Sequence, residues 1–365
     1  MSIAVTAVPA RKTATDRVVA YWLIATAVMI LLMVVIGGVT RLTESGLSIT
    51  EWQPVTGALP PLSQAAWADA FEKYQQIPEY REIHHGMTFD EFKGIFFWEY
   101  LHRLWGRLIG LVALVPLVVF LGQRRIKGAD VPFLIAVPVL VALQGALGWY
   151  MVESGLAVRT SVSQYRLTAH LMLAIAIYGY LIWIAADILR REPLWLDGMR
   201  VRRFRRAARG ILALVTLTMI AGGFTAGLKA GLTYNSFPLM DGRFVPAGYL
   251  QLDPWWRNLF ENIATVQFDH RLLAETTFCS ILAFWLAARR QCLPRTLRTP
   301  LNALMLVACL QVALGVSTLL LVVPVPLAAA HQAGAVLLFT CALLTLHGLR
   351  EPRGARKPVA EDPVV

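Results

Sequence analysis

The stretch VVAYWLIATAVMILLMVVIGGV, residues 18–39, decides the fold class of this chain, because it continues without one charged side chain. A helix needs about 20 mostly apolar residues to cross the roughly 30 Å hydrocarbon core of a bilayer. The rest of the sequence has the same character: 57% of its 365 residues are hydrophobic and 16% are charged, which lies outside the usual range of soluble domains. Long uninterrupted apolar runs also exclude a barrel of alternating strands. The sequence therefore predicts an all-α integral membrane protein.

Apolar stretches of this length occur eight times, each bounded by charges or by Gly, Pro or Asn. The first is expected to be retained as a membrane anchor, because it is longer than the apolar part of a signal peptide and no small-residue cleavage site follows it. The eight expected transmembrane helices are, approximately, Val18 to Val39, Ile95 to Leu121, Val131 to Val152, Leu167 to Leu189, Gly210 to Leu228, Ala264 to Ala288, Pro300 to Val323 and Leu327 to Leu349.

The net charge of +11 reflects the loops between these helices. Most of the 34 Lys and Arg residues lie before the first span or after the second, fourth, sixth and eighth spans. By the positive-inside rule this side faces the cytoplasm, so both termini are expected to be cytoplasmic. Anionic headgroups of the lipid bilayer are the expected partners of these side chains. Nucleic-acid binding is not expected, because no aromatic side chains are interleaved among them.

Self-comparison reveals matching motifs in the two halves of the chain. An even number of spans per half gives both copies the same orientation, so we expect two parallel-repeat four-helix bundles. The matching motifs are Gly37-Gly38-Val39-Thr40 with Gly222-Gly223-Phe224-Thr225, His102-Arg103 with His270-Arg271, Gln144 with Gln311, and Ala169-His170 with Ala330-His331. The expected organisation is a cytoplasmic tail (1–17), an N-terminal bundle (18–190), a basic cytoplasmic linker (191–209), a C-terminal bundle (210–349) and a second cytoplasmic tail (350–365).

The repeat places four histidines inside spans, His102 and His170 in the first half and His270 and His331 in the second. Each is expected a turn or two past the outer end of its span. Two histidines at matched depth on two helices of one bundle can supply both axial bonds to a haem iron. The alternative for any one of them is a polar group that bonds a neighbouring helix. Zinc is less suited, because two imidazoles without a paired Cys or carboxylate fall short of its usual ligand set.

One carboxylate distinguishes the two halves. Glu99 stands three residues before His102, and therefore on the same helix face, whereas Gln267 occupies the equivalent place in the second half. A carboxylate inside a span is costly, so Glu99 is a candidate acid or base beside a haem, with a snorkelling interfacial residue as the alternative. The pattern favours chemistry in the first bundle and electron transfer in the second.

Arg103 and Arg271 directly follow two of the histidines and point elsewhere around the helix. Their guanidinium groups are suited to pairing with haem propionates, and snorkelling to the interface is the alternative. His84, His85 and His347 are expected to be solvated or interfacial. The two long outer loops, about residues 44–94 and 229–263, are expected to cap the outer face. No disulfide framework is expected among the cysteines, because they lie in or beside the last three spans without a Cys-x-x-Cys spacing: Cys279, Cys292, Cys309 and Cys341.

Three segments carry a family resemblance: GGVTRLTESGLS at residues 37–48, Glu99-Tyr100-Leu101-His102-Arg103, and Trp105-Gly106-Arg107. Together with four repeated histidines on eight spans, they resemble the heme A synthase family of the proteobacterial and mitochondrial type, over about residues 18–349. In that family the enzyme, an oxidoreductase, oxidises the C8 methyl of haem O to a formyl group, which gives haem A for terminal cytochrome oxidases. The resemblance implies that His102 and His170 hold the substrate haem, that Glu99 takes part in catalysis, and that His270 and His331 ligate a haem b cofactor.

The resemblance also implies a bacterial inner-membrane location, contacts with haem O synthase and with cytochrome oxidase assembly, and it admits a homo-oligomer. Some family members carry a cysteine pair in the outer loops, which this chain lacks, so a thiol-dependent role of these loops is in doubt. The alternative class is a non-catalytic di-haem cytochrome b-type electron-transfer subunit. Such subunits tend to place their haems near opposite membrane faces, whereas all four histidines here are expected near one face. A transporter is less favoured, because the repeat is not inverted and no series of charges crosses the midplane.

Overall fold

The computed structural model describes residues 5–7, 15–53, 56–126, 128–156, 159–189, 194–196, 199–291 and 293–350. Most of the two predicted tails, 1–17 and 350–365, lies outside the described residues, as do parts of the predicted linker 191–209 and Cys292.

Eight helices in the described part of the chain are long and apolar enough to cross a membrane. The prediction of an all-α fold with eight transmembrane helices is therefore confirmed, and the chain is a multi-pass membrane protein. These helices are α1 (Arg17–Leu42), α4 (Phe89–Gly122), α5 (Val131–Leu156), α6 (Gln164–Leu189), α7 (Met199–Gly227), α9 (Ile263–Arg289), α10 (Arg295–Leu320) and α11 (Val325–Gly348).

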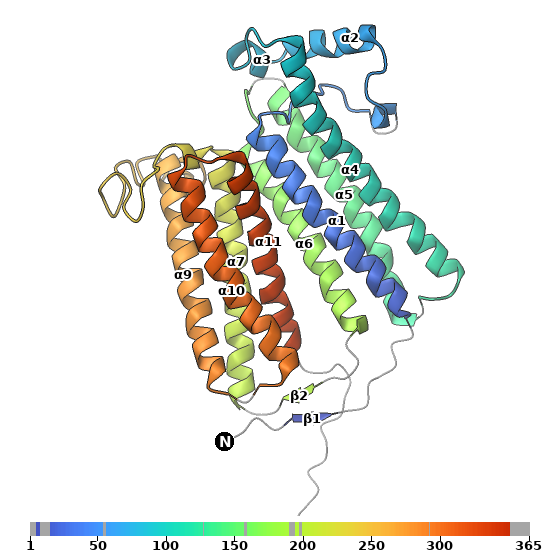
Figure 1. Cartoon of the computed structure of the whole chain (residues 1–365), viewed down its shortest axis with the longest axis vertical. Helices are drawn as coiled ribbons and strands as arrows, with labels where there is room; N and C mark the ends of the chain where they lie inside the picture. The colour runs from blue at the N-terminus through green and yellow to red at the C-terminus, as the bar shows by residue number, and fades with distance from the viewer. Residues whose placement is uncertain are drawn as a thin grey trace, which may run out of the picture.

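The eight long helices form two groups of four that lie side by side (Figure 1). Helices α1, α4, α5 and α6 contact one another in a closed ring, and α7, α9, α10 and α11 form a second ring. The first group covers the range of the predicted N-terminal bundle and the second that of the C-terminal bundle. The origin of the two groups as copies of one repeated unit stays a prediction.

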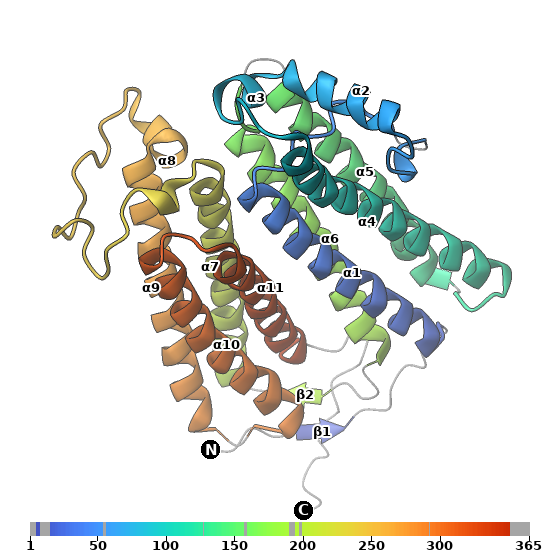
Figure 2. The same cartoon turned by 45° about the horizontal axis from the view of Figure 1, so that its top comes forward.

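Short elements lie at both ends of the long helices. The two strands β1 and β2 pair antiparallel at one end, and α2 and α3 lie at the other, across the ends of the first group (Figure 2). The short elements are β1 (Val5–Ala7), η1 (Thr56–Ala58), α2 (Gln64–Gln75), α3 (Pro78–Glu82), η2 (Gly128–Asp130), β2 (Leu194–Leu196), η3 (Ala230–Leu232), η4 (Trp255–Arg257) and α8 (Asn258–Glu261).

Residues 44–94, which include α2 and α3, form what we call the α2 layer. It has a small apolar core of its own, built on Leu47, Tyr74, Ile77, Phe92 and Phe96. Two of these side chains, Phe92 and Phe96, come from the first turns of α4. The layer therefore fixes the end of α4 to the loop that follows α1.

Several helices begin earlier than the sequence predicted, and the differences are largest for α4 and α7. Helix α4 begins at Phe89 instead of about Ile95, because Thr88 and Glu91 form a capping box that satisfies the first free N–H groups. Helix α7 begins at Met199 instead of about Gly210, so the second part of the predicted linker is helical. Its arginines are good helix formers and allow the helix to continue past the apolar stretch.

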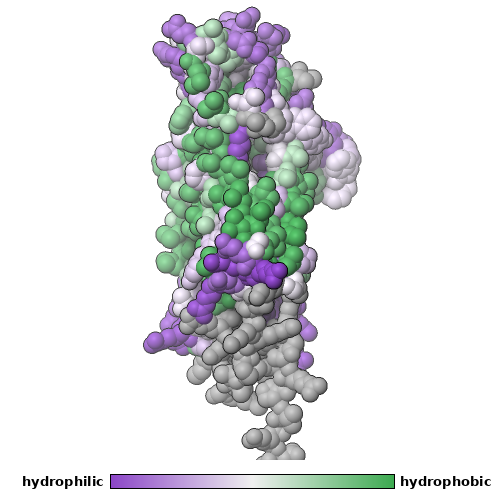
Figure 3. Space-filling model, turned by 90° about the vertical axis from the view of Figure 1, so that its right-hand side faces the viewer, coloured by the Kyte–Doolittle hydropathy of each residue, from purple (hydrophilic) through white to green (hydrophobic). Residues whose placement is uncertain are grey.

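The surface has the polarity of a membrane protein. On the side shown in Figure 3, an apolar band separates polar regions towards the two ends of the molecule. Many large apolar side chains of the long helices are exposed, among them Leu111, Val118, Val139, Leu143, Leu306 and Leu310. Such a surface is stable against lipid chains rather than against water.

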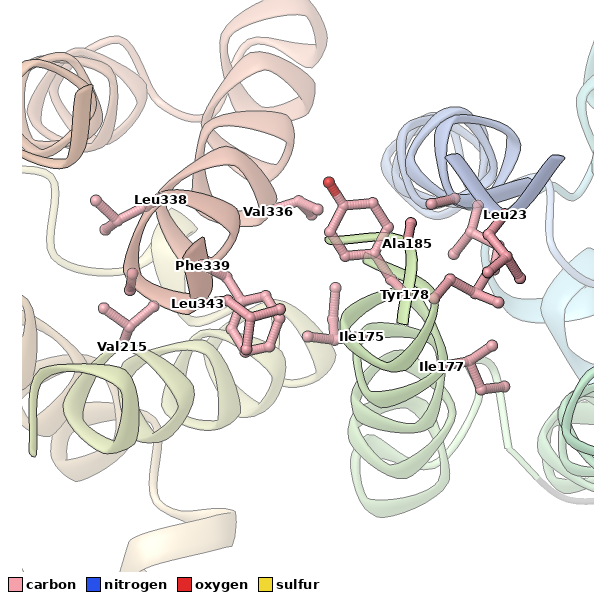
Figure 4. Packing of buried hydrophobic residues seen from close by; sticks show 14 of the residues in the cluster. Leu23, Ile175, Ile177, Tyr178, Ala185, Val215, Val336, Leu338, Phe339 and Leu343 are labelled. Carbon is pink, nitrogen blue, oxygen red and sulfur yellow. The ribbon is translucent and has the colours of Figure 1, made fainter. Parts of the chain in front are cut away.

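Helices α6 and α11 pack across the boundary between the two groups (Figure 4). Ile175 and Tyr178 of α6 are buried and point toward α11, Ile175 toward Phe339 and Tyr178 toward Val336. The Tyr178 hydroxyl lies 2.8 Å from Thr340 Oγ1. Gly179 permits the close approach, since a Cβ atom at this position would lie 3.0 Å from the Phe339 ring. The two groups therefore share one continuous apolar core.

Candidate functional site

The four intramembrane histidines lie toward the same end of the long helices, the end that carries the α2 layer. His170, His270 and His331 stand within about the first two turns of α6, α9 and α11, and His102 lies further along the longer helix α4. All four are half-buried. The two histidines of each half are near enough for a charge on one imidazole to act on the other. The structure thus brings His102 together with His170, and His270 with His331.

Each of the four imidazole rings packs against a glycine of a neighbouring helix. Any larger residue at these glycines would press on the ring, so the ring positions depend on a missing side chain. The glycines of the first half match those of the second, and a Cβ atom would lie 3.0 Å from His102 at Gly37, 2.9 Å from His170 at Gly148, 3.1 Å from His270 at Gly222 and 2.8 Å from His331 at Gly315.

Two glutamines support the histidines of α6 and α11. The Gln144 side chain donates to the carbonyl of His170 at 2.9 Å, and Gln311 donates to the carbonyl of His331 at 2.9 Å. These residues are the repeat-related glutamines seen in the sequence. Because the same bond recurs in both halves, each helix turn that carries a histidine is tied to the neighbouring helix.

The donor set of the second pair fits the axial ligation of a haem iron. With Nδ1 as the donor, His270 bonds the carbonyl of Thr218 at 3.2 Å, which leaves Nε2 as the lone-pair donor that a metal requires. The buried Nδ1 of His331 has no hydrogen-bond partner among the described residues. No group of three His, Cys, Asp or Glu side chains in the same part of the chain is arranged to hold a metal ion. Paired imidazoles on two helices are instead the ligand set of haem.

Glu99 is buried, with 2% of its surface exposed, and this burial argues against a snorkelling interfacial residue. Its Oε2 accepts hydrogen bonds from the Ser48 hydroxyl and from the Ile49 N–H, both at 2.7 Å. Its Oε1 accepts from Arg103 Nη2 at 2.7 Å and from Nε at 3.1 Å. All four bonds come from donors, so the side chain acts as an acceptor-only carboxylate.

The two arginines beside the histidines make matching contacts with the loops after α1 and α7. Each guanidinium donates to two backbone carbonyls that are two residues apart. These bonds hold the loop against α4 in the first half and against α9 in the second. In the structure both groups are engaged with the protein backbone, and their pairing with haem propionates stays a prediction. The acceptors are Ile49 and Glu51 for Arg103, at 2.6 and 2.8 Å, and Tyr234 and Ser236 for Arg271, at 2.7 and 2.8 Å.

A polar cluster inside the α2 layer was missed by the sequence analysis. The Tyr74 hydroxyl lies 2.6 Å from His84 Nδ1 and 3.5 Å from Glu79 Oε2. His84 Nε2 lies 3.6 Å from Glu44 Oε2, and only 15% of the His84 side chain is exposed. Of the expectation of a solvated or interfacial His84, the solvated alternative is therefore wrong, because the neighbouring helix α2 supplies a buried hydroxyl; the interfacial alternative stays a prediction. His85 is exposed.

Burial changes the acid–base properties of this cluster. Loss of solvent and the nearby charges of Glu99 and Glu44 raise the pKa of Glu79 to about 8. Burial likewise raises the pKa of Tyr74. At neutral pH the interior of the α2 layer therefore holds a largely protonated carboxyl group beside a neutral phenol.

His347 lies at the opposite end, where α6 meets α11. It is buried, and its Nε2 lies 2.5 Å from Asp187 Oδ1. Arg350 pairs with the same carboxylate. His347 is therefore not solvated, because Asp187 of the first group supplies a partner between the two groups of helices; its expected position near the membrane interface stays a prediction. Among the described cysteines, Cys279, Cys309 and Cys341 carry free thiols.

Eight long apolar helices with two histidine pairs toward one end define a multi-pass membrane protein with candidate sites for haem. The chain belongs to the cytochrome oxidase assembly protein family (COX15-CtaA), whose family model matches residues 20–343.

Curated relatives match the chain over nearly its whole length. The chain is 50% identical to the protein named heme A synthase of Nitrosospira multiformis, over 93% of this chain and 96% of that protein. It is 49% identical to the heme A synthase of Parvibaculum lavamentivorans, over 92% of this chain and 95% of the relative. It is 41% identical to the protein named heme A synthase COX15 of Saccharomyces cerevisiae, over 94% of this chain and 78% of the relative. The similarity thus extends to bacterial and yeast proteins of one name.

Proposed function

We propose that the protein is a haem A synthase, an oxidoreductase that converts the C8 methyl of haem O into a formyl group. The observation that carries this proposal is an asymmetry between two matched histidine pairs. In the first pair, a buried carboxylate, Glu99, lies one helix turn from His102, and in the described part of the chain the second pair has no such group. The names of the relatives from Nitrosospira, Parvibaculum and yeast support the same reaction. The product, haem A, would serve terminal cytochrome oxidase.

In this proposal the first half is the catalytic half. His102 and His170 hold haem O by its iron, and Gln144 keeps the His170 turn in place. Conversion of a methyl to a formyl group removes hydrogens and electrons and adds an oxygen atom, so an external electron acceptor and an oxygen donor, water or dioxygen, must act with the protein. The protons released and the positive charge that develops must be accommodated. A fixed carboxylate beside the reacting group can stabilise developing positive charge or orient a water molecule. Glu99 meets the requirement, because it is buried on the helix that carries His102.

The second half would hold a resident haem b. His270 and His331 are its proposed iron ligands, and the hydrogen bond from His270 to Thr218 orients one imidazole for this task. When bound, haem b supplies one-electron transfer. Gln267 replaces the carboxylate here, so this half lacks the group that we assign to the chemistry.

We further propose that residues 18–190 and 210–349 are the two functional units, in the inner membrane of a bacterium, with the α2 layer outside and both termini in the cytoplasm. The basic residues support this orientation, because they collect at the helix ends opposite the α2 layer. Contacts with haem O synthase, with cytochrome oxidase assembly and between copies of the chain belong to the same proposal. They would let a sparingly soluble haem pass between enzymes without leaving the membrane.

The test is an analysis of the haems made and bound by the protein. Cells that produce haem O and lack their own haem A synthase would be supplied with the chain, and the extracted haems would be separated by chromatography. Appearance of haem A supports the proposal, and haem O alone would overturn it. Haem b as the sole bound pigment, without haem A in the cells, would indicate the electron-transfer subunit, and the absence of bound haem would indicate a transporter.

A further inference from the structure

The loop after α1 folds back onto the catalytic carboxylate and places Ser48 against it. Ser48 is buried, with 1% of its surface exposed. Its hydroxyl lies 2.7 Å from Glu99 Oε2, closer than the carbonyls of Ser45 at 3.0 Å and Ile95 at 3.5 Å. A carboxylate is also the stronger acceptor, so the hydroxyl proton is directed at Glu99.

Comparison with the second half shows which of these hydrogen bonds serve only to hold the loop to the helix. There Gln267 donates to the carbonyl of Tyr234 at 3.1 Å, and Arg271 donates to the same carbonyl. A tether between helix and loop is thus common to both halves. The position that corresponds to Ser48 is Thr233, which is exposed. A hydroxyl bonded to the side chain at the Glu99 position therefore occurs in the first half and has no counterpart in the second.

The hydrogen bonds on Glu99 also restrict what this carboxylate can do. Both oxygens are occupied by donors: Ser48 and Ile49 on one, Arg103 on the other. Rotation of the carboxylate toward a mobile proton would break its bonds with the buried Ser48 hydroxyl and the half-buried Ile49 N–H, which is costly. A charge that is already oriented acts without reorganisation during the reaction.

We propose that Ser48 is a positioning residue for the oxidation of haem O, and that Ser48, Ile49 N–H and Arg103 hold Glu99 as a fixed anion rather than as a mobile proton acceptor. This inference rests on the proposed function. Ser48 acts through Glu99 and not on the haem itself. Loss of its hydroxyl is therefore expected to slow the reaction without weakening the binding of haem O.

The experiment compares three variants with wild type in membranes supplied with haem O. Ser48→Ala removes the hydroxyl, Ser48→Thr retains it, and Ser45→Ala is the matched control. Ser45 is also fully buried in this loop, but its hydroxyl bonds within the loop, at Thr43. The readouts are kcat and KM for haem O, the haem bound per protein, and the thermal stability of the purified protein.

For Ser48→Ala we expect kcat to fall at least about tenfold, the scale of one hydrogen bond to a charged group, with unchanged KM and bound haem. Ser48→Thr and Ser45→Ala are expected to stay within about threefold of wild type, which is less than the loss of such a bond. A wild-type kcat in Ser48→Ala would overturn the inference, as would equal losses in folded Ser48→Ala and Ser48→Thr.

Two further outcomes are distinguishable. If Ser48→Ala does not fold, Ser48→Cys decides, because it keeps the volume of the side chain with a weaker donor; a wild-type kcat in this variant would overturn the inference. If the wild-type protein makes no haem A, the proposed function is wrong. The positioning role of Ser48 is then wrong as well, because it depends on that reaction. A normal wild type with an unaffected Ser48→Ala overturns only the positioning role.

Discussion

Glu99 and Gln267 occupy equivalent places in the two halves, yet their hydrogen bonds to the adjoining loop have opposite polarity. Glu99 accepts the N–H of Ile49 at 2.7 Å, whereas Gln267 donates to the carbonyl of Tyr234 at 3.1 Å. Each bond joins the same helix position to the same loop position. The scaffold is therefore conserved between the halves, and the charge is the feature that differs.

The first prediction concerns this charge. Glu99→Gln keeps the shape of the side chain, but its NH₂ group would meet donors where the carboxylate accepted bonds. We expect a folded protein with both haem sites, and haem A production lower by about 10²-fold or more, the scale of a missing catalytic group. Haem O or a partly oxidised product should accumulate, as measured by chromatography of extracted haems.

The control for this variant is Glu91→Gln on the same helix, since Glu91 belongs to the exposed capping box of α4. It is expected to leave the haem A content unchanged. A wild-type content of haem A in Glu99→Gln would remove this residue from the mechanism.

The second prediction separates the two histidine pairs. Replacement of both His270 and His331 by Ala removes the proposed axial ligands, and we expect loss of the low-spin haem b spectrum. His102→Ala should keep that spectrum and stop haem A formation. His85→Ala is the control, because this histidine is exposed and should change neither property. Retention of a normal haem b spectrum in the double variant would show that the assignment is wrong.

The third prediction uses the glycines behind the imidazoles. Gly148→Ala would place a Cβ atom 2.9 Å from the His170 ring and displace it. We expect this variant to lose haem O binding and haem A formation while it retains haem b. Gly145→Ala on the same helix is the control, since no atom within 4 Å would meet its Cβ. Equal haem A yields from the two variants would contradict the proposal that His170 binds the haem iron in the ring position that Gly148 permits.

The fourth prediction follows from the pKa of Glu79, which burial raises from 4.5 to about 8. A carboxyl that is protonated in the folded state and ionised in the unfolded state makes folding take up a proton. The α2 layer should therefore be most stable below about pH 4.5 and lose stability as the pH rises toward 8, with no further loss from this group above that value. Hydrogen exchange in peptides from residues 64–94, corrected for intrinsic rates, measures the effect. Glu79→Gln should flatten the dependence, and an unchanged slope in this variant would assign it to another group.

The fifth prediction concerns orientation. A reporter fused after Arg350 should be active in the cytoplasm, because most Lys and Arg residues flank that side of the spans. The same reporter inserted between α2 and α3 should be active in the periplasm. Activity of the Arg350 fusion only in the periplasm would invert the proposed topology.

The sequence was sufficient for the helices and for the pairing of histidines, because both depend on patterns that extend over many residues. The eight apolar stretches predicted eight spans, and the repeated histidines lie near each other in pairs, although no comparison tests their role as ligands. Contacts formed by loops were not visible. Ser48 was part of a recognised motif, but nothing in its neighbours shows that the loop returns to Glu99. Tyr74 and His84 are ten positions apart on different elements, and only the tertiary fold of the α2 layer joins them.

The two groups of helices are joined by charges at both ends. Glu44 of the first group pairs with Lys229 of the second near the α2 layer, and Asp187 pairs with Arg350, which follows α11, at the opposite end. Together with the shared apolar core, these two pairs oppose sliding and tilting of one group against the other. Electron transfer between two centres slows steeply as their separation grows, so a protein that passes electrons between its halves needs a constant tunnelling distance. In the proposed function, the paired charges at the two ends would keep the distance between the two haem sites constant.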